Sequence, residues 1–321
     1  MKIAVVTGVY NEERHIAELI EAVLNQNLKL DEFILVDDGS KDKTAEIIKK
    51  YAEQNSFIKY FYQKNAGPAS ARNHAWKNSS SDICIFTDGD CVPNKNWIEK
   101  LIQPFNNESV GATAGTYKTV NIQSILARFI GLEIEWKHSR YGKNINVHGT
   151  YNLAVRKNIL EEIGGLDESY PVPSGEDWDM TYKISKKYKI AFISEAIVGH
   201  YHPEKFWPYM KNQVRRGFDR MKVYKDHPNL IKGDSYTPWF VKYQVLTSGF
   251  FPISLLLFFP LFKFSYIVPL ATILFLILAS LPPFVYFFKK DKAVAFYSIP
   301  VQIARNFAWF WGMIKGIIKN L

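Results

Sequence analysis

The first 110 residues alternate short apolar runs with amphipathic stretches, and this alternation restricts the possible folds more than any other feature of the sequence. The strand-like runs are residues 2–7, 32–37, 57–62 and 82–87. The helical patterns are residues 12–27, 42–54 and 67–79. Such an alternation predicts an α/β fold, in which helices flank both faces of a mostly parallel sheet.

Polar and glycine residues follow each of the four strand-like runs. They are Tyr10, Asn11 and Glu12; Asp37, Asp38, Gly39 and Ser40; Lys64, Asn65 and Gly67; and Asp88 and Asp90. Right-handed crossovers place the carboxyl ends of parallel strands at one edge of a sheet, where such folds bind ligands. The sequence therefore predicts a single polar site assembled from four strand ends.

Two carboxylates stand one residue apart where the fourth apolar run ends, at Asp88 and Asp90. One interpretation is a simple turn, because Asp-Gly is a common turn dipeptide. The other is a cation site, because hard oxygen ligands suit Mg²⁺ or Mn²⁺. Such an ion would neutralise a diphosphate leaving group. The chain has neither a P-loop nor a Gly-x-Gly-x-x-Gly fingerprint that could bind phosphates instead.

The overall charge of +9, from 40 Lys and Arg against 31 Asp and Glu, favours an anionic partner. Nucleic acid, nucleotide phosphates and an acidic membrane surface all fit this charge. Cys84 and Cys91 are expected to be reduced core residues, which favours the cytosol. We expect residues 1–13 to begin with the first strand and not to form a signal peptide.

The C-terminal part of the chain is strongly apolar. Residues 245–262 and 264–288 contain no charge over 18 and 25 residues, and a membrane span needs about 20. The lysines that follow, Lys289, Lys290 and Lys292, predict a cytoplasmic position. A third segment, 293–318, is expected to be an interfacial amphipathic helix or a further span.

These patterns divide the chain into three predicted regions. Residues 1–203 form the catalytic domain, and residues 204–240 form a basic amphipathic region next to the membrane. Residues 241–321 form the membrane domain. The alternative, that the apolar segments are buried helices of a soluble protein, conflicts with their lack of a polar face.

Several fragments together resemble glycosyltransferase family 2, whose members have the nucleotide-sugar-binding GT-A fold. They are TGVYNEE at 7–13, VDDGSKDKT at 36–44, NAGPASARN at 65–73, TDGDCVP at 87–93, GGLDE at 164–168 and GEDWDM at 175–180. The resemblance covers roughly residues 1–230 and matches the family in order and spacing. It implies a Rossmann-like GT-A domain joined here to C-terminal membrane helices.

The resemblance implies a donor site at the strand ends. Its nucleotide-sugar-binding residues would be Thr7, Tyr10, Glu12, Asp37, Asp38, Gly67, Arg72, Asp88 and Gly89. Tyr10 would flank the base, Asp38 would accept a hydrogen bond from it, and Arg72 would reach the base or the diphosphate. Asp37 is expected to fix the turn.

The resemblance also implies a metal site for Mn²⁺ or Mg²⁺. Asp88 and Asp90 match the Asp-x-Asp motif, in which the second acid is the usual direct ligand. His200 follows a Val-Gly pair and would be an extra ligand, while His202 would face away. The alternative for His200 is a structural hydrogen bond.

Catalysis is assigned to the acid pair Glu176 and Asp177, which begins a helical pattern. By resemblance, Asp177 is the general base for the acceptor hydroxyl, and Glu176 orients the acceptor or the helix. Displacement at the anomeric carbon would then invert its configuration. An acidic helix start without catalytic function is the alternative.

The resemblance also implies that the acceptor meets a second group of residues. These are Trp136, His148, Gly149, Asn152, Gln213, Arg215 and Arg216. The arginines suit phosphate oxygens or, equally, anionic lipid. Gly217 stands where processive polysaccharide synthases carry Trp, which favours a non-processive enzyme.

The sequence thus predicts an inverting, metal-dependent hexosyltransferase on the cytoplasmic face of the cell membrane. A UDP-sugar is the favoured donor, a GDP-sugar remains open, and the acceptor would be polyprenyl- or dolichyl-linked. The alternative within this class is a polyprenyl-phosphate monosaccharide synthase, similar to dolichyl-phosphate-mannose synthase. A nucleic-acid-binding scaffold is disfavoured, because the basic excess lies beside the apolar segments and acids crowd the predicted site.

Overall fold

The computed structural model describes residues 1–170, 174–237, 239–258 and 267–320. The chain forms two compact units, and each is described by itself. Unit 1 comprises Met1–Val120 and Tyr141–Tyr201, and unit 2 comprises Asn121–Arg140 and His202–Leu321.

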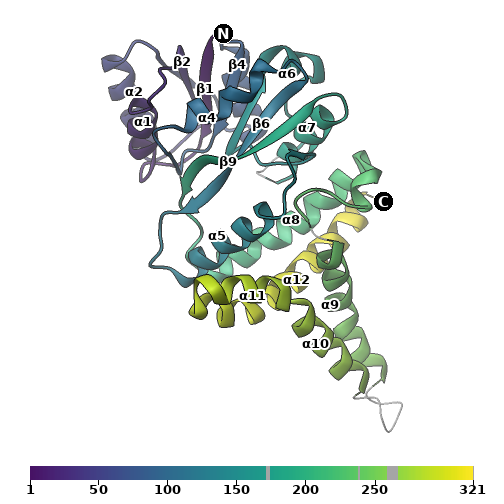
Figure 1. Ribbon diagram of the computed structural model, residues 1–321. Helices are drawn as coiled ribbons and strands as arrows, with labels where there is room; N and C mark the ends of the chain where they lie inside the picture. Colours follow the sequence, from purple (N-terminus) through teal and green to yellow (C-terminus); the bar gives the residue numbers. More distant parts are fainter. Residues whose placement is uncertain (171–173, 238, 259–266, 321) are drawn as a thin grey trace. The chain divides into compact units, whose positions relative to one another are not determined.

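Unit 1 is built on a nine-stranded sheet whose main order is β3-β2-β1-β4-β8-β6-β9-β5, with β7 paired to β9 (Figure 1). The strands are β1 Ile3–Val9, β2 Glu32–Asp37, β3 Ile58–Tyr62, β4 Ile83–Thr87, β5 Cys91–Pro93, β6 Val110–Thr119, β7 Asn144–Ile145, β8 Asn152–Arg156 and β9 Lys189–His200. β1 is central, since Val5 pairs in parallel with Phe33 of β2 and Ile85 of β4. The predicted parallel arrangement is confirmed for β1–β4, whereas β8 runs antiparallel to β4 and β6 and makes the complete sheet mixed.

Helices cover both faces of this sheet, as predicted. The helices of unit 1 are α1 Ile16–Leu24, α2 Thr44–Gln54, α3 Pro68–Lys77, α4 Trp97–Ile102, α6 Lys157–Ile163 and α7 Glu176–Ser185, with a 3₁₀ turn η1 at Gln103–Asn106. Alternate residues of β1 enter two cores: Val5 packs with α1, α2 and α4, while Val6 packs with α3, α6 and α7. The two apolar layers hold the strand ends in fixed positions.

Unit 2 consists of helices. They are α5 Ile125–His138, α8 Phe206–Asp226, α9 Trp239–Phe258, α10 Ile267–Ala279, α11 Leu281–Lys290 and α12 Lys292–Asn320, with a 3₁₀ turn η2 at Pro228–Ile231. The predicted catalytic domain, residues 1–203, includes residues 121–140, but α5 belongs to unit 2. Its Leu126, Phe129 and Trp136 share a core with residues of α8, α11 and α12, and burial of this apolar face explains the grouping.

α8 and α12 approach each other at backbone distance. A Cβ atom at Gly217 would overlap the Trp309 carbonyl, and one at Gly312 would overlap the Val214 carbonyl. Close helix packing therefore requires glycine at these positions. It also gives a structural reason for Gly217, which stands where processive synthases carry Trp.

The apolar C-terminal segments differ in part from the predicted spans. Among the described residues, no single helix is both long and apolar enough to cross a membrane, but α10 and α11 together pass this test with a 42° bend between them. The described part of the span predicted at 264–288 thus consists of two helices, α10 and α11, and not of one. α11 has proline at its first turn, and a Pro ring with no N–H cannot continue the preceding helix. Residues 259–266, which include parts of both predicted spans, lie outside the described residues.

Candidate active site

The carboxylates at the end of β2, Asp37 and Asp38, accept hydrogen bonds from nearby groups and so hold the local structure. Asp37 is buried, and its carboxylate accepts hydrogen bonds from the Ser40 N–H at 2.8 Å and the Tyr60 hydroxyl at 3.2 Å. Asp38 is 4% exposed and accepts hydrogen bonds from the Gln63 amide and the Ala66 N–H, both at 2.8 Å, and from the Gly67 N–H at 2.9 Å.

Asp37 therefore fixes its turn, in the role that the sequence analysis gave it. Asp38 holds the loop that leads into α3, with about three of its four acceptor positions filled. Gly67 has φ of +97°, a backbone conformation that favours glycine, and precedes Pro68 at the start of α3. The predicted contact of Asp38 with a base is thus limited to its one remaining acceptor position.

Two further donor-site predictions can be placed. The side chain of Thr7 is fully buried in β1, so its predicted contact with a nucleotide is wrong for this conformation. Tyr10 is 44% exposed, as a residue that flanks a base has to be. Asn11, which was not assigned a function, has φ of +57° and accepts a hydrogen bond from the Lys41 N–H at 2.8 Å. Its signal in the sequence is its place beside Tyr10 at a strand end.

The acids after β4 have different surroundings. Asp88 is half-buried, and its Oδ1 accepts a hydrogen bond from Nη2 of Arg72 at 2.8 Å. Nη1 of the same guanidinium donates to Oε1 of the buried Glu176 at 2.9 Å. Arg72 thus joins the end of β4 to the start of α7 through two ion pairs. Arg72 is expected from the resemblance to reach the donor. Its link to Glu176 is not predictable from the sequence, because Glu176 is 104 residues away in the chain.

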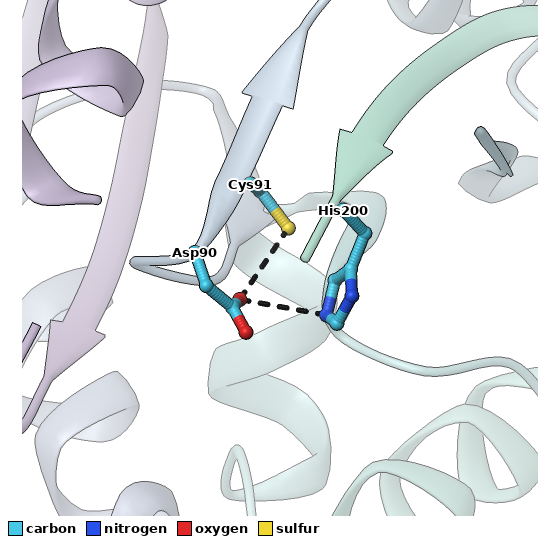
Figure 2. Close-up of side chains that lie close together, drawn as sticks. All are labelled: Asp90, Cys91 and His200. Carbon is cyan, nitrogen blue, oxygen red and sulfur yellow. Dashed lines mark hydrogen bonds and ion pairs between the residues drawn. The ribbon is translucent and has the colours of Figure 1, made fainter. Parts of the chain in front are cut away.

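Asp90, Cys91 and His200 form a cluster, shown in Figure 2. Cys91 and His200 are partners in the antiparallel pairing of β5 and β9, so their side chains lie on the same face. Nε2 of His200 lies 3.4 Å from Oδ1 of Asp90, and Sγ of Cys91 lies 3.9 Å from the same oxygen. Cys91 is predicted only as a core residue, although its place directly after Asp90 is a usable signal.

Glu12 adds a third carboxylate to this region. Burial, followed by the charges of Asp90, Asp88 and Asp42, raises the pKa of Glu12 to about 8. Burial also raises the pKa of Asp90, and the charge of Asp88 acts in the same direction while that of His200 opposes it. Acids that repel one another beside a histidine fit a divalent cation. Asp90 and His200, which lie together with Cys91, could hold one, and Glu12 and Asp88 add negative charge nearby.

The start of α7 carries the predicted catalytic pair. Glu176 is buried, and burial raises its pKa to about 7, with the charge of Asp177 acting in the same direction and that of Arg72 opposing it. Its Oε2 accepts the Ser174 N–H at 2.8 Å. Of the two roles predicted for Glu176, these contacts support orientation of the helix and not of the acceptor, because the side chain is buried and holds the start of α7. Residues 171–173 of the preceding loop lie outside the described residues.

Asp177 is half-buried, and its Oδ1 accepts the Trp178 N–H at 2.8 Å. A Cβ atom at Gly149 would lie 3.3 Å from its Oδ2, so the two residues predicted as base and acceptor contact are neighbours. The Tyr151 ring occupies the space beside Gly149, since the same Cβ atom would lie 2.5 Å from its Cδ1 and Cε1.

The other residues predicted to contact the acceptor lie in different surroundings. Asn152 is fully buried, accepts a hydrogen bond from Trp97 Nε1 and donates to the Thr116 and Ala196 carbonyls, so its predicted acceptor contact is wrong. His148 is also buried, and burial lowers its pKa to about 3. Its side chain is therefore neutral and part of an aromatic layer that includes Tyr151, 5.0 Å away between ring centroids.

Trp136, Gln213, Arg215 and Arg216 belong to unit 2. Trp136 is buried, with its ring centroid 6.1 Å from that of Phe240, and Gln213 accepts a hydrogen bond from Trp309 Nε1 at 2.8 Å. These contacts give both side chains a role in helix packing. Arg215 and Arg216 are exposed on α8.

Comparisons with solved structures support the fold. A mannosyltransferase from Pyrobaculum calidifontis, PcManGT, solved with GDP-Man and Mn²⁺, aligns over 100% of this chain and 88% of its own with a TM-score of 0.66 and 16% identity. GalNAc-T7, solved with UDP, GalNAc and Mn²⁺, aligns over 71% of this chain and 50% of its own with a TM-score of 0.54 and 18% identity. At these identities the likeness shows the GT-A fold alone.

Sequence comparisons show the family. The probable glycosyltransferase YdaM of Bacillus subtilis is 31% identical over 67% of this chain and 55% of its own length. Glycosyltransferase AglE of Haloferax volcanii is 27% identical over 69% of this chain and 74% of its own. Residues 4–164 match the family model described as Glycosyl transferase family 2. The expectation drawn from the motifs is thereby confirmed, and the chain belongs to glycosyl transferase family 2.

Proposed function

We propose that this protein is an inverting, metal-dependent glycosyltransferase that transfers a sugar from a nucleotide-sugar donor to a lipid-linked acceptor at a membrane. The observation that carries the proposal is the connection Asp88–Arg72–Glu176, with ion-pair distances of 2.8 and 2.9 Å. It links the acids that would bind the donor to the residue beside the proposed base, Asp177. Donor binding and acceptor activation would therefore occur within one unit.

Each residue of this site has its own proposed role in the reaction. Asp90 and His200, with Asp88 and Glu12, would hold a divalent cation, which supplies charge neutralisation for the leaving diphosphate when bound. Asp177 accepts the proton of the acceptor hydroxyl as that oxygen attacks the anomeric carbon. Attack from the face opposite the nucleotide inverts the configuration. Arg72 and Glu176 position the two ends of the site.

The donor and the acceptor are proposed only as classes. Structural neighbours were solved with GDP-Man and with UDP-GlcNAc, so both UDP- and GDP-sugars belong in a test panel. Exposed apolar side chains on α9 and α10, among them Leu246, Phe250, Leu270 and Leu274, support attachment to a membrane and a lipid-linked acceptor. The basic residues after the second apolar segment support a cytoplasmic catalytic unit.

The first experiment is a thermal-shift panel on the full chain in detergent, with UDP- and GDP-sugars, each with Mn²⁺ or with EDTA. A bound donor at free concentration L stabilises the folded protein by RT ln(1 + L/Kd), so the melting temperature rises with the logarithm of its concentration relative to Kd. We expect one nucleotide class to raise it with Mn²⁺ and to lose most of the effect with EDTA. If no nucleotide sugar shifts the transition under either condition, the proposed donor class is wrong.

The second experiment uses the donor so identified in a transfer assay, with extracted membrane lipids as acceptors. Asp177→Asn separates the two acceptor classes. A sugar hydroxyl needs a base, so its transfer should fall by about 100-fold or more. A polyprenyl phosphate is already ionised, so near-normal rates with Asp177→Asn favour the monosaccharide synthase.

A further inference from the structure

Unit 2 buries two cations around one carboxylate. Glu133 and Lys137 lie one turn apart on α5, and Arg305 comes from α12; they are 7%, 8% and 4% exposed. Arg305 Nη1 donates to Oε1 of Glu133, and Nζ of Lys137 lies 3.5 Å from the same oxygen. One carboxylate oxygen therefore serves two positive charges.

The surroundings of this cluster leave a positive excess. The charged groups that act most strongly on Lys137 are Glu133, Arg305 and Arg216, and only the first is acidic. Burial lowers the pKa of Lys137 to about 8, against the attraction of Glu133, and Arg305 and Arg216 lower it further. Tyr236 and Tyr209 are neutral neighbours: the Lys137 Nζ lies 4.6 Å from the Tyr236 ring centroid, and burial raises the pKa of Tyr209 to about 12.

A second ion pair in the same unit is balanced in charge, with one cation for one carboxylate. Arg128, also on α5, pairs with Asp291 at 2.8 Å, and each of these side chains keeps more than a fifth of its surface in solvent. That pair needs no further ion. A buried charge is costly unless it is paired, so the surplus cation at Lys137 requires either loss of its proton or an additional anion.

The chemistry of the cluster indicates which anion would bind. A guanidinium and an ammonium group together suit phosphate oxygens, and Arg216 places a third cation on the exposed side of α8. Unit 2 also exposes large apolar side chains, including Tyr243, Phe250, Phe296 and Trp311. An anion that carries an apolar chain matches both features.

We propose that Lys137 and Arg305 bind the phosphate group of a membrane lipid, with Arg216 at the entrance to this site. The choice of a lipid rests on the membrane attachment in the proposed function. The phosphate chemistry rests on the buried charges alone. Glu133 acts as a positioning residue that holds the two cations apart from each other and close to the ligand.

The test measures binding of farnesyl phosphate to the full-length protein in neutral detergent, by ³¹P NMR and thermal shift. Farnesol supplies the apolar chain without charge, and inorganic phosphate supplies the charge without the chain. We expect farnesyl phosphate to bind at least about tenfold more tightly than either. Equal binding of farnesol would overturn the proposal, and equal binding of inorganic phosphate would replace the lipid with a free ion.

Lys137→Gln is the informative variant, because it leaves the Glu133–Arg305 pair balanced. We expect it to keep or raise the melting temperature of the ligand-free protein and to lose about tenfold or more in affinity for farnesyl phosphate. Arg128→Gln, which removes the same charge from the same helix, should keep that affinity. A lowered melting temperature with unchanged affinity would make Lys137 purely structural, and equal loss of affinity in both variants would indicate a general charge effect.

The same samples are tested for nucleotide-sugar binding, so that the two proposals fail separately. Donor binding without lipid-phosphate binding contradicts only the site at Lys137 and Arg305. Lipid-phosphate binding without any donor binding contradicts only the proposed transferase function. Lys137→Gln should leave donor affinity unchanged, because Lys137 belongs to unit 2 and the donor residues belong to unit 1.

Discussion

Two pairs of acids close two strands of the same sheet and have opposite roles. Asp37 and Asp38 after β2 accept five hydrogen bonds from neighbouring backbone and side-chain groups. Asp88 and Asp90 after β4 face an arginine, a histidine and, in Glu12, another acid. In the sequence both pairs appear as acids that end an apolar run.

The difference shows how a structural acid is distinguished from a functional one. Backbone N–H groups that point at a carboxylate stabilise its charge and use its acceptor positions. The charge of Asp88 raises the pKa of Asp90, and the charges of both raise that of Glu12, so these groups favour the binding of a cation or a proton. On this basis the acids after β2 build the scaffold, and those after β4 are available for a ligand.

The largest effect is expected for Asp90→Asn. Loss of the proposed cation ligand should lower kcat about 1,000-fold, which corresponds to about 4 kcal/mol of transition-state stabilisation. Removal of one repelling charge should leave the melting temperature unchanged or higher. Initial rates and thermal unfolding of the same preparation check both points, and a variant that keeps a tenth of the wild-type rate would contradict the assignment.

Arg72→Gln should have the next largest effect, because it removes the link between Asp88 and Glu176. We expect kcat to fall by roughly 100-fold, with a smaller change in KM for the donor. Arg72→Lys should rescue little, since an ammonium group cannot reproduce the planar fork. A raised KM with unchanged kcat would instead support the direct donor contact that the sequence predicted.

Asp38→Asn tests the acid pair at the end of β2. It should lower the free energy of unfolding by about 2 kcal/mol, because an amide cannot accept all the hydrogen bonds of the carboxylate. Urea unfolding measures this change. Asp90→Asn is the matched control, and equal destabilisation by the two variants would remove the distinction between the two acid pairs.

Glu12 is expected to change the pH dependence of stability. Its pKa is raised to about 8, so the folded protein binds a proton that the unfolded chain releases near pH 4.5. This contribution is complete below pH 4.5 and is lost as the pH rises through about 8. In EDTA, the wild type should therefore lose more stability than Glu12→Gln between pH 5 and 8.

Manganese ions provide the control for this titration. A bound cation favours the ionised form of Glu12, so Mn²⁺ should reduce the difference between wild type and Glu12→Gln. Thermal unfolding of both proteins at several pH values, with and without Mn²⁺, measures this difference in stability. A difference between the proteins that Mn²⁺ does not alter would place the ion away from Glu12.

The sequence predicted the features that depend on local pattern. The strands β1–β4 and helices α1–α3 follow from hydrophobic periodicity, and the meeting of Tyr10, Asp38 and Asp88 at one edge follows from parallel topology. What it missed depends on contacts distant in the chain. Asn152 looks like a polar site residue until Thr116 and Ala196 are seen to take its amide protons.

The assignment of α5 to unit 2 is not predictable from the sequence for a related reason. α5 has the periodicity of any amphipathic helix, and only its packing with α11 and α12 assigns it to unit 2. The role of Arg72 was missed because its partners lie 16 and 104 residues away. Composition and spacing carry no information about such pairs.

The central claim is that the acids after β4, and not those after β2, bind a divalent cation. It is tested most directly by manganese anomalous scattering from crystals grown with Mn²⁺ and a nucleoside diphosphate. We expect one strong anomalous peak in contact with Asp90 and His200, with the diphosphate bound to the same ion. A peak beside Asp38, or a diphosphate bound with no manganese near Asp90, would contradict it.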